Sequence, residues 1–544
     1  MHGASSDFFI GPAYRPVPPH LVSSASFRPV SRAAYRTAAK PQNVPGRRYA
    51  GAVSTTSTTQ SNRWPAFIVT IAVAVTTILD LVKVNVTIAP MEETLGLTSS
   101  QAQLIVAGYV LAFGILLVPS GRLGDIWNRK AMFIIGLVVF ASASLYCALA
   151  PDATQLVIAR LIQGVAAGIL MPQVIGLIQN LFQGQERGQA FGIFGASIGI
   201  GTAFGPTIGG LFIGGLGAEL GWRWTFGMNV PLALIILPFA IWLIPGKQKH
   251  QASKDLDLIG TLLMAGTVLF VMLPFVLTSG GEEDDPARWW FLLVAAVLGV
   301  AFVWWERRYV AAGKSPVIDF GLFRWPSYRN GVLITTLMFG MMPPLFFVLT
   351  LYQQQGLGHA AVVVGMVTIP FAFTSAISAA VSGRYTFQHA TTLVLSGLVV
   401  FWIAILGIVL VVLFVGPADT PMWLAIVLGF GGIGQGLVMS ANQMRAMKHV
   451  PLESAGVGGS FMQVGQRLGN AMGIAIATSI FFSIVASLPL VGGVPDPTDP
   501  NTIATYRDAA SAAITFVIAL GVVAIALAFM DWRIDQREKR EGTA

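Results

Sequence analysis

The 544-residue sequence contains one cysteine, Cys147, and six histidines. A single cysteine cannot form an internal disulfide or supply a cysteine-based metal site. The sequence also has no nucleotide-binding glycine loop, no nucleophile motif and no connecting segment long enough for a catalytic domain. We therefore expect a protein that is not an enzyme and that binds neither a metal nor a cofactor. An embedded enzyme or a membrane sensor is the alternative.

Charged residues are scarce as well. Asp, Glu, Lys and Arg make up 11% of the sequence, whereas hydrophobic residues make up 54%. A soluble chain of this length needs roughly twice this share of charge to cover its surface, and a lipid bilayer removes that need. The formal net charge of +8 is spread over short segments between apolar stretches. This distribution argues against a nucleic-acid partner and favours a membrane protein.

The first 63 residues differ in composition from the rest. They are rich in Ser, Thr, Pro, Ala and Arg, and Asp7 is their only acid. This composition predicts a disordered cytoplasmic tail over residues 1–63. An organelle transit peptide is the alternative. A secretory signal is not expected, because no apolar segment is followed by a small-residue cleavage site.

Apolar stretches of about 20 residues, the length that a helix needs to cross the hydrocarbon core, recur after the tail. The sequence therefore predicts an all-α integral membrane protein with about fourteen transmembrane helices. They are expected at residues 65–89, 102–120, 131–150, 154–181, 188–215, 222–244, 256–277, 289–311, 328–352, 360–382, 391–415, 422–446, 456–486 and 508–530.

The connecting segments alternate in charge, as expected if Lys and Arg collect on the cytoplasmic side. Every second connection is basic, with Arg122, Arg129 and Lys130, Arg187, Lys247, Lys249 and Lys254, Arg307, Arg308, Lys314 and Arg324, Arg384, Arg445 and Lys448, and finally Arg533, Arg537, Lys539 and Arg540. The intervening connections are acidic or neutral, with Glu92, Glu93, Asp152, Glu219, Glu282 to Asp285, Asp419, Asp496 and Asp499. The pattern predicts a multi-pass protein of the cell membrane with both termini in the cytoplasm.

Four ionisable residues lie deep in the predicted spans: Asp80, Lys83, Arg160 and Arg467. Asp80 and Lys83 share a helix face and are close enough for an ion pair. The pair either holds helices together or exchanges protons and meets substrate; Arg160 either clamps helices or influences a nearby carboxylate. We favour the functional interpretation, because other polar residues lie at similar depths. The candidate cavity residues are Asn85, Gln163, Asn229, Asn442, Gln463 and Arg467.

Two further segments have unusual patterns. The predicted fifth span contains Gly201, Gly205, Pro206, Gly209 and Gly210. This glycine spacing gives a smooth face for close helix contact, and the proline predicts a kink. The loop after the second span contains Gly121, Arg122, Gly124, Asp125, Arg129 and Lys130. An aspartate there can accept from an arginine or a helix N-terminus and form a latch between two conformations; a static basic loop is the alternative.

Together these segments resemble the major facilitator superfamily over roughly residues 64–530, and more narrowly its fourteen-span drug:proton antiporter branch. Gly121 to Lys130 is similar to the superfamily's loop motif, Gly-x-Leu-x-Asp-x-x-Gly-Arg-Lys/Arg. Arg160 to Gly164 is similar to the fourth-helix arginine motif, and Gly201 to Gly210 to the antiporter motif of the fifth helix. Leu79-Asp80 with Val84-Asn85-Val86, and Trp222 to Pro231, complete five motifs in order.

The resemblance implies two six-helix bundles, residues 64–246 and 328–530, around a central cavity. Residues 247–327 would hold two inserted helices, and residues 531–544 a cytoplasmic tail. Rocking of the bundles would give alternating access. It further implies that Asp80 is the proton-linked carboxylate, that Arg160 tunes it, and that Asp125, Arg122 and Arg129 form a cytoplasmic gate.

The sequence departs from this family pattern in two places. Ile126 and Asn128 stand where the family has Arg and Gly; since Asn tolerates a left-handed backbone, only the absent arginine weakens the latch. Lys83 should repel a cationic drug, which shifts the expectation toward neutral or anionic substrates. We expect a functional monomer that exports small amphipathic compounds in exchange for protons, with the lipid bilayer as its surroundings. Proton symport or facilitated uptake of a polar nutrient is the alternative.

Overall fold

The computed structural model describes residues 63–246, 257–277, 285–318, 320–486 and 499–541. Within these ranges, fourteen helices are long and apolar enough to cross a membrane. The predicted all-α membrane fold and its number of spans are therefore confirmed. The predicted tail up to residue 62 lies outside the described residues, as do Lys247, Lys249, Lys254, Glu282, Glu283, Asp284 and Asp496.

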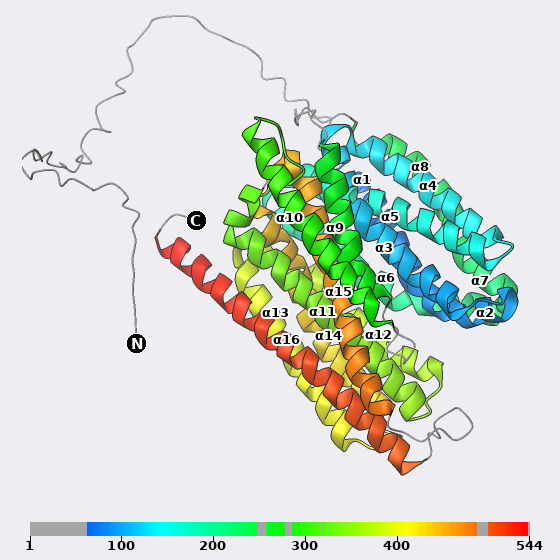
Figure 1. The fold of residues 1–544 in the computed structure, drawn as a ribbon. Helices are drawn as coiled ribbons and strands as arrows, with labels where there is room; N and C mark the ends of the chain where they lie inside the picture. Colours follow the sequence, from blue (N-terminus) through cyan, green and yellow to red (C-terminus); the bar gives the residue numbers. More distant parts are fainter. Residues whose placement is uncertain (1–62, 247–256, 278–284, 319, 487–498, 542–544) are drawn as a thin grey trace, which may run out of the picture. The chain divides into compact units, whose positions relative to one another are not determined.

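The first six spans consist of α1 (Arg63–Lys83) with η1 (Val84–Thr87) and α2 (Ile88–Leu95), α3 (Ser99–Ile126), α4 (Arg129–Leu149), α5 (Ala153–Leu181), α6 (Gly184–Leu216), and α7 (Ala218–Gly227) with α8 (Asn229–Leu243). The next two are α9 (Leu258–Val276), and η2 (Pro286–Trp289) with α10 (Trp290–Ala311). The last six are α11 (Pro326–Leu351), α12 (Ala361–Gly383), α13 (Thr386–Phe414), α14 (Thr420–Ala446), α15 (Ala455–Val485) and α16 (Pro500–Arg540). Figure 1 labels most of these helices.

Several helices begin at the polar residue that the sequence places before an apolar run. Thr98 and Gln101 form a reciprocal capping box at the start of α3. Asp152 accepts from the backbone N–H of Gln155 at the start of α5, at 2.9 Å. These side chains satisfy N–H groups that the first helical turn leaves without an acceptor. Short polar connections can therefore end one span and begin the next within a few residues.

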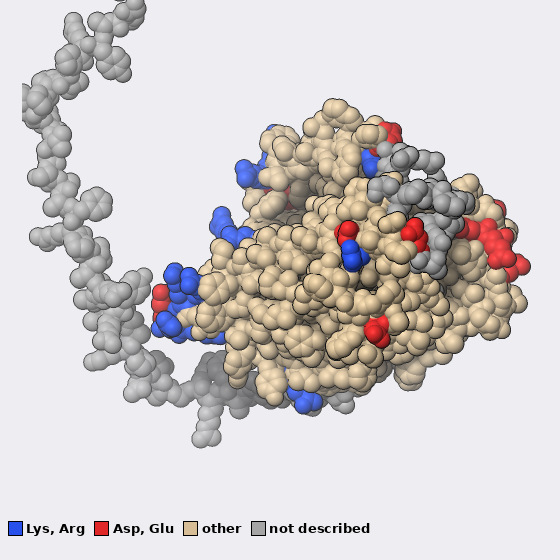
Figure 2. All heavy atoms as spheres, turned by 90° about the horizontal axis from the view of Figure 1, so that it is seen from below, with Lys and Arg blue, Asp and Glu red and all other residues tan. Residues whose placement is uncertain are grey.

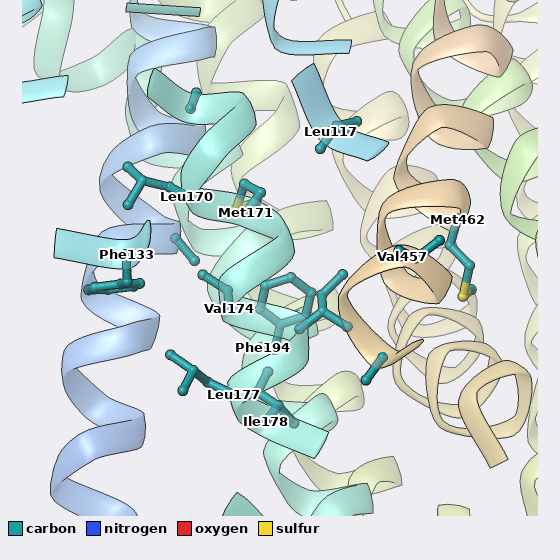
Figure 3. Close-up of a cluster of buried hydrophobic side chains, with 14 of the residues drawn as sticks. Leu117, Phe133, Leu170, Met171, Val174, Leu177, Ile178, Phe194, Val457 and Met462 are labelled. Carbon is teal, nitrogen blue, oxygen red and sulfur yellow. The ribbon is translucent and has the colours of Figure 1, made fainter. Parts of the chain in front are cut away.

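Two large apolar clusters hold the helices together. The first is centred on α5 and α1, with residues from α3, α4 and α6, and it also includes residues from α15. Figure 3 shows part of it, in which α5 carries Leu170, Met171, Val174, Leu177 and Ile178 among Leu117, Phe133, Phe194, Val457 and Met462. The second joins α11, α13, α14 and α16. The outer surface is largely uncharged as well: on the face in Figure 2 most atoms belong to uncharged residues, as a lipid environment requires.

Helices from the first and last groups of six contact one another in two places. α3 and α5 pack against α15, and α6 packs against α12 and α14. The α6 contact is close, because a Cβ atom at Gly192 would lie only 2.7 Å from the carbonyl oxygen of Ala379. The additional helix α9 packs against α10, α3 and α15. Glycine permits this backbone approach where any larger residue would separate the helices.

The last helix differs most from its expected bounds. We expected a span at 508–530 followed by a tail, whereas α16 continues to Arg540. Asp531 and Asp535 are buried on this extension and pair with Arg445 of α14. Thr391 of α13 also donates to Asp535, at 2.9 Å. Charge in this segment suggested a solvated tail, but pairing with a buried arginine keeps the acids inside the protein.

Candidate functional site

Asp80 lies at the centre of a fully buried polar cluster formed by α1, α5 and α8. Nη1 of Arg160 lies 2.7 Å from Asp80 Oδ2, and Nζ of Lys83 lies 3.2 Å from Asp80 Oδ1. Asn229 donates from Nδ2 to Asp80 Oδ1 at 2.7 Å and accepts from Lys83 at 2.8 Å. All four side chains are at most 1% exposed. One carboxylate is thus held between two cations and an amide.

A second layer of polar groups fixes the two cations. Gln163 accepts from Arg160 Nη1 at 2.7 Å and donates to the hydroxyl of Ser144 at 2.8 Å. Asn229 also donates to this hydroxyl, at 3.2 Å, and the hydroxyl donates to the Phe140 carbonyl at 2.7 Å. The Ser144 oxygen therefore uses its one donor and both acceptor positions. This fixes the position of Ser144 in the network, although Nη2 of Arg160 is buried without a hydrogen-bond partner among the described residues.

Aromatic rings enclose the guanidinium of Arg160. Its Cζ lies 4.3 Å from the ring centroid of Tyr109 and 5.5 Å from that of Phe226. Nε of Arg160 donates to the Ile105 carbonyl at 3.0 Å. The rings exclude water, which strengthens the attraction between Arg160 and Asp80.

The loop motif joins α3 to the start of α15. Asp125 accepts from the backbone N–H groups of Gly456 and Val457 at the N-terminus of α15, each at 3.1 Å. Arg129 pairs with Asp125 and donates to the carbonyl oxygens of Leu452, at 2.8 Å, and Gly176, at 2.8 Å. The aspartate thus acts on a helix N-terminus from another part of the chain, where a negative charge is favourable.

The other motif residues contact four different segments of the protein. A Cβ atom at Gly121 would collide with the Ser460 hydroxyl, and one at Gly124 would collide with the Gln173 side chain. Arg122 donates to the Ser315 carbonyl at 3.4 Å, in the segment after α10. Lys130 donates to the Ile241 carbonyl at 2.6 Å.

Asn128 does not have the backbone conformation that we expected. Its φ of −168° is extended rather than left-handed. The side chain instead caps α4 by accepting from the backbone N–H groups of Lys130, at 2.9 Å, and Ala131, at 3.2 Å. Our left-handed interpretation was wrong because asparagine is a strong N-cap as well as a tolerant turn residue.

The glycine-rich helix α6 divides its motif between two environments. Gly201, Gly205 and Gly209 face α1 and η1, where added Cβ atoms would lie 3.2, 3.0 and 2.5 Å from Ile78, Val82 and Val86. At Gly210 no atom of another described helix or loop lies within 4 Å of such a position. The helix continues through the half-buried Pro206 as one element. Three glycines therefore bring α6 against the helix that carries Asp80.

The remaining cavity candidates lie outside the Asp80 cluster. Asn85 is exposed on η1. Asn442 of α14 donates to Thr335 of α11 at 2.7 Å and lines a pocket between these two helices. Gln463 and Arg467 lie one turn apart on α15 and are buried. Of the predicted polar residues, the structure thus brings together Asp80, Lys83, Arg160, Gln163 and Asn229.

Sequence reasoning missed Ser144 and Tyr109, which complete the cluster. A serine or tyrosine inside an apolar span is common, and no spacing rule relates either to a carboxylate on α1. The Arg445 network was missed for another reason, since Asp531 and Asp535 follow the last apolar stretch. Only their burial separates them from ordinary surface acids.

Comparison with known proteins agrees with this architecture. The family model described as Major Facilitator Superfamily matches residues 66–474. A probable actinorhodin transporter of Streptomyces coelicolor is 29% identical over 430 residues, which cover 78% of this chain and 74% of the relative. The puromycin resistance protein of Streptomyces alboniger is 30% identical over 474 residues, which cover 85% of this chain and 90% of the relative.

A solved structure shares the fold at low sequence identity. The crystal structure of a human organic anion transporter aligns with a TM-score of 0.59 and 14% identity, covering 86% of this chain and 98% of that one. Together with the five motifs and fourteen spans, the family match over residues 66–474 leads to one assignment. The chain belongs to the major facilitator superfamily and is similar to its fourteen-span drug-efflux branch.

Proposed function

We propose that this transporter exports small amphipathic compounds across the cell membrane in exchange for protons. The observation that carries the proposal is Asp80, a carboxylate with no exposed surface that binds Arg160 and Lys83. Protonation removes its charge and weakens both contacts, so Arg160 and Lys83 must then find other partners. A proton can thereby change how α1 packs against α5.

The relatives support export as the direction of transport. Their names associate them with actinorhodin transport and puromycin resistance. Export is a direct route to resistance against an internal or entering antibiotic. We extend this role to the present chain, with a small molecule and protons as its transported partners and a monomer as the functional unit.

The helix contacts support alternating access by two bundles. We propose that residues 64–246 and 328–530 move relative to each other, and that residues 247–327 contribute helices inserted between them. The Asp125 latch joins α3 to the start of α15. Its formation closes one side of the α3–α15 contact, and its release allows that side to open.

Topology has a direct test because Cys147, the only cysteine, is fully buried. We expect Glu219→Cys to react with a membrane-impermeant maleimide added outside intact cells, and Lys314→Cys to react only after the membrane is opened. Both positions are exposed. We propose cytoplasmic termini and an even number of spans. Labelling of both cysteines from the same side would contradict this orientation.

The direction of proton movement separates antiport from its alternative. Purified protein is reconstituted into liposomes that contain a pH-sensitive dye, and rhodamine 6G or fluorescein is added outside. Entry of a probe by antiport expels protons, so we expect the interior to become more alkaline than in protein-free liposomes. Acidification would favour symport, and probe entry without a pH change would favour facilitated transport.

A further inference from the structure

Arg467 is a buried cation without a carboxylate partner among the described residues. It lies midway along α15 and is 9% exposed. Three other buried arginines among the described residues pair with an acid: Arg129 with Asp125, Arg160 with Asp80, and Arg445 with Asp531. An unpaired ion at membrane depth is costly, and such ions mark ligand or ion pathways. The position therefore calls for an anion from outside the described chain.

A second unsatisfied donor lies beside it. Gln463 is one helical turn earlier on α15 and 3% exposed. Its Nε2 and the Nε of Arg467 are both buried without a hydrogen-bond partner in the part of the chain that the structure describes. Buried donors are normally paired, and both of these groups can only donate. Two such donors on one helix face match a ligand that supplies acceptor oxygens.

Aromatic rings of α3 pack against Arg467. The Cζ atom of Arg467 lies 4.2 Å from the ring centroid of Phe113 on α3. Phe113 makes an edge contact with Tyr109, with ring centroids 6.1 Å apart, and Tyr109 in turn stacks on Arg160. The unpaired arginine thus lies between the two groups of six helices, and two aromatic rings separate it from the Asp80 cluster.

We propose that Arg467 and Gln463 bind the anionic group of the transported compound, an organic anion with a carboxylate or phenolate. The guanidinium fork suits two acceptor oxygens, and the buried ring of Phe113 beneath it makes the surroundings of this cation apolar. This region contains three positive charges, on Lys83, Arg160 and Arg467, and one negative charge, on Asp80. The local field therefore attracts anions and repels cations. This inference rests on the proposed transport function and names its substrate class.

The membrane potential is compatible with such a substrate. A cell interior is negative, so the potential favours outward movement of an anion. The side chain of Arg467 stays charged under all physiological conditions. Recognition of an anion at this position therefore needs no change in the protonation of the binding residue.

Two dyes with the same xanthene ring system test the proposal: fluorescein is an anion and rhodamine 6G is a cation. Their binding to purified full-length protein is measured by fluorescence polarisation. We expect the wild-type protein to prefer fluorescein. Arg467→Gln should weaken fluorescein binding about tenfold or more, the loss expected when a charged hydrogen bond is removed. Rhodamine 6G binding should be unchanged or stronger.

Two further variants separate binding from folding. Arg467→Lys keeps the charge and should retain an intermediate affinity for fluorescein. Arg384→Gln removes an exposed arginine at the end of α12 and should bind both dyes like the wild type. An equal loss of both dyes in Arg467→Gln, unchanged fluorescein binding, or a wild-type protein that prefers rhodamine 6G or binds neither dye would overturn the proposal.

The proposed transport function can fail independently. If fluorescein binds through Arg467 but its entry into proteoliposomes moves no protons, proton coupling is wrong and the anion site stands. If proton exchange occurs with both dyes and Arg467→Gln does not alter their relative affinity, the anion site is wrong and the coupling stands.

Discussion

Asp80→Asn is expected to reduce proton-coupled transport to the level of protein-free liposomes. The amide keeps the shape of the carboxylate but cannot take up and release a proton. It also leaves Lys83 and Arg160 without the negative charge that both now contact, at 3.2 and 2.7 Å. Loss of one partner of a buried ion pair costs about 3–5 kcal/mol. We therefore expect a lower melting temperature together with the loss of transport.

A double variant separates these two effects. Asp80→Asn combined with Lys83→Met removes one negative and one positive charge, so the cluster keeps the charge of Arg160 alone. Methionine has nearly the volume of lysine without its ammonium group. We expect the melting temperature to recover in part, since Arg160 still lacks its carboxylate, and coupled transport to remain absent. Proton-driven efflux at wild-type rate in the double variant would exclude Asp80 as the coupling group.

Sequence patterns predicted the fold because the bilayer imposes strong rules on composition. Any span must be a helix of about 20 apolar residues, and basic residues collect on one side. Both rules apply to each segment of the sequence separately, and neither requires knowing which helices pack together. The ends of the spans were less predictable. The last helix continues to Arg540 because Arg445 of α14 pairs with two of its acids, a contact that no local pattern encodes.

The candidate site was predictable where its residues are close in sequence. Asp80 and Lys83 are three residues apart, and this spacing alone implied their ion pair. Arg160 and Asn229 are far from Asp80 in the sequence. Only their position deep in a predicted span identified them as polar residues that need partners. Ser144 gave no such signal, because a serine inside a span can bond to its own helix, as its bond to Phe140 shows.

The sequence could not show which buried cations lack a carboxylate partner. Arg467 was a candidate from its charge and depth alone, and either a carboxylate partner or a free cavity position fitted that pattern. The structure distinguishes these cases, because Arg467 stacks on Phe113 and pairs with no acid among the described residues. Burial of a charge can be inferred from a sequence, but the identity of its partner depends on how helices pack.

Asp125→Asn is expected to open the latch and reduce transport by one to two orders of magnitude, the effect of about 2–3 kcal/mol on a two-state equilibrium. The carboxylate now accepts from two backbone N–H groups of α15 and from Arg129. An amide lacks the negative charge that favours this helix terminus and the arginine. The conformation with separated α3 and α15 should therefore become more populated.

Accessibility of Ser460 measures this shift. Ser460 has no exposed surface, and it lies where a side chain on Gly121 would collide with it. We expect Ser460→Cys to be unreactive toward a maleimide in inside-out vesicles and to become reactive when Asp125→Asn is added. Asp152→Asn is the matched control, because Asp152 also serves a helix N-terminus, but within its own segment and without joining two parts of the fold. If Ser460→Cys reacts equally with and without Asp125→Asn, then Asp125 stabilises one helix end and does not control opening.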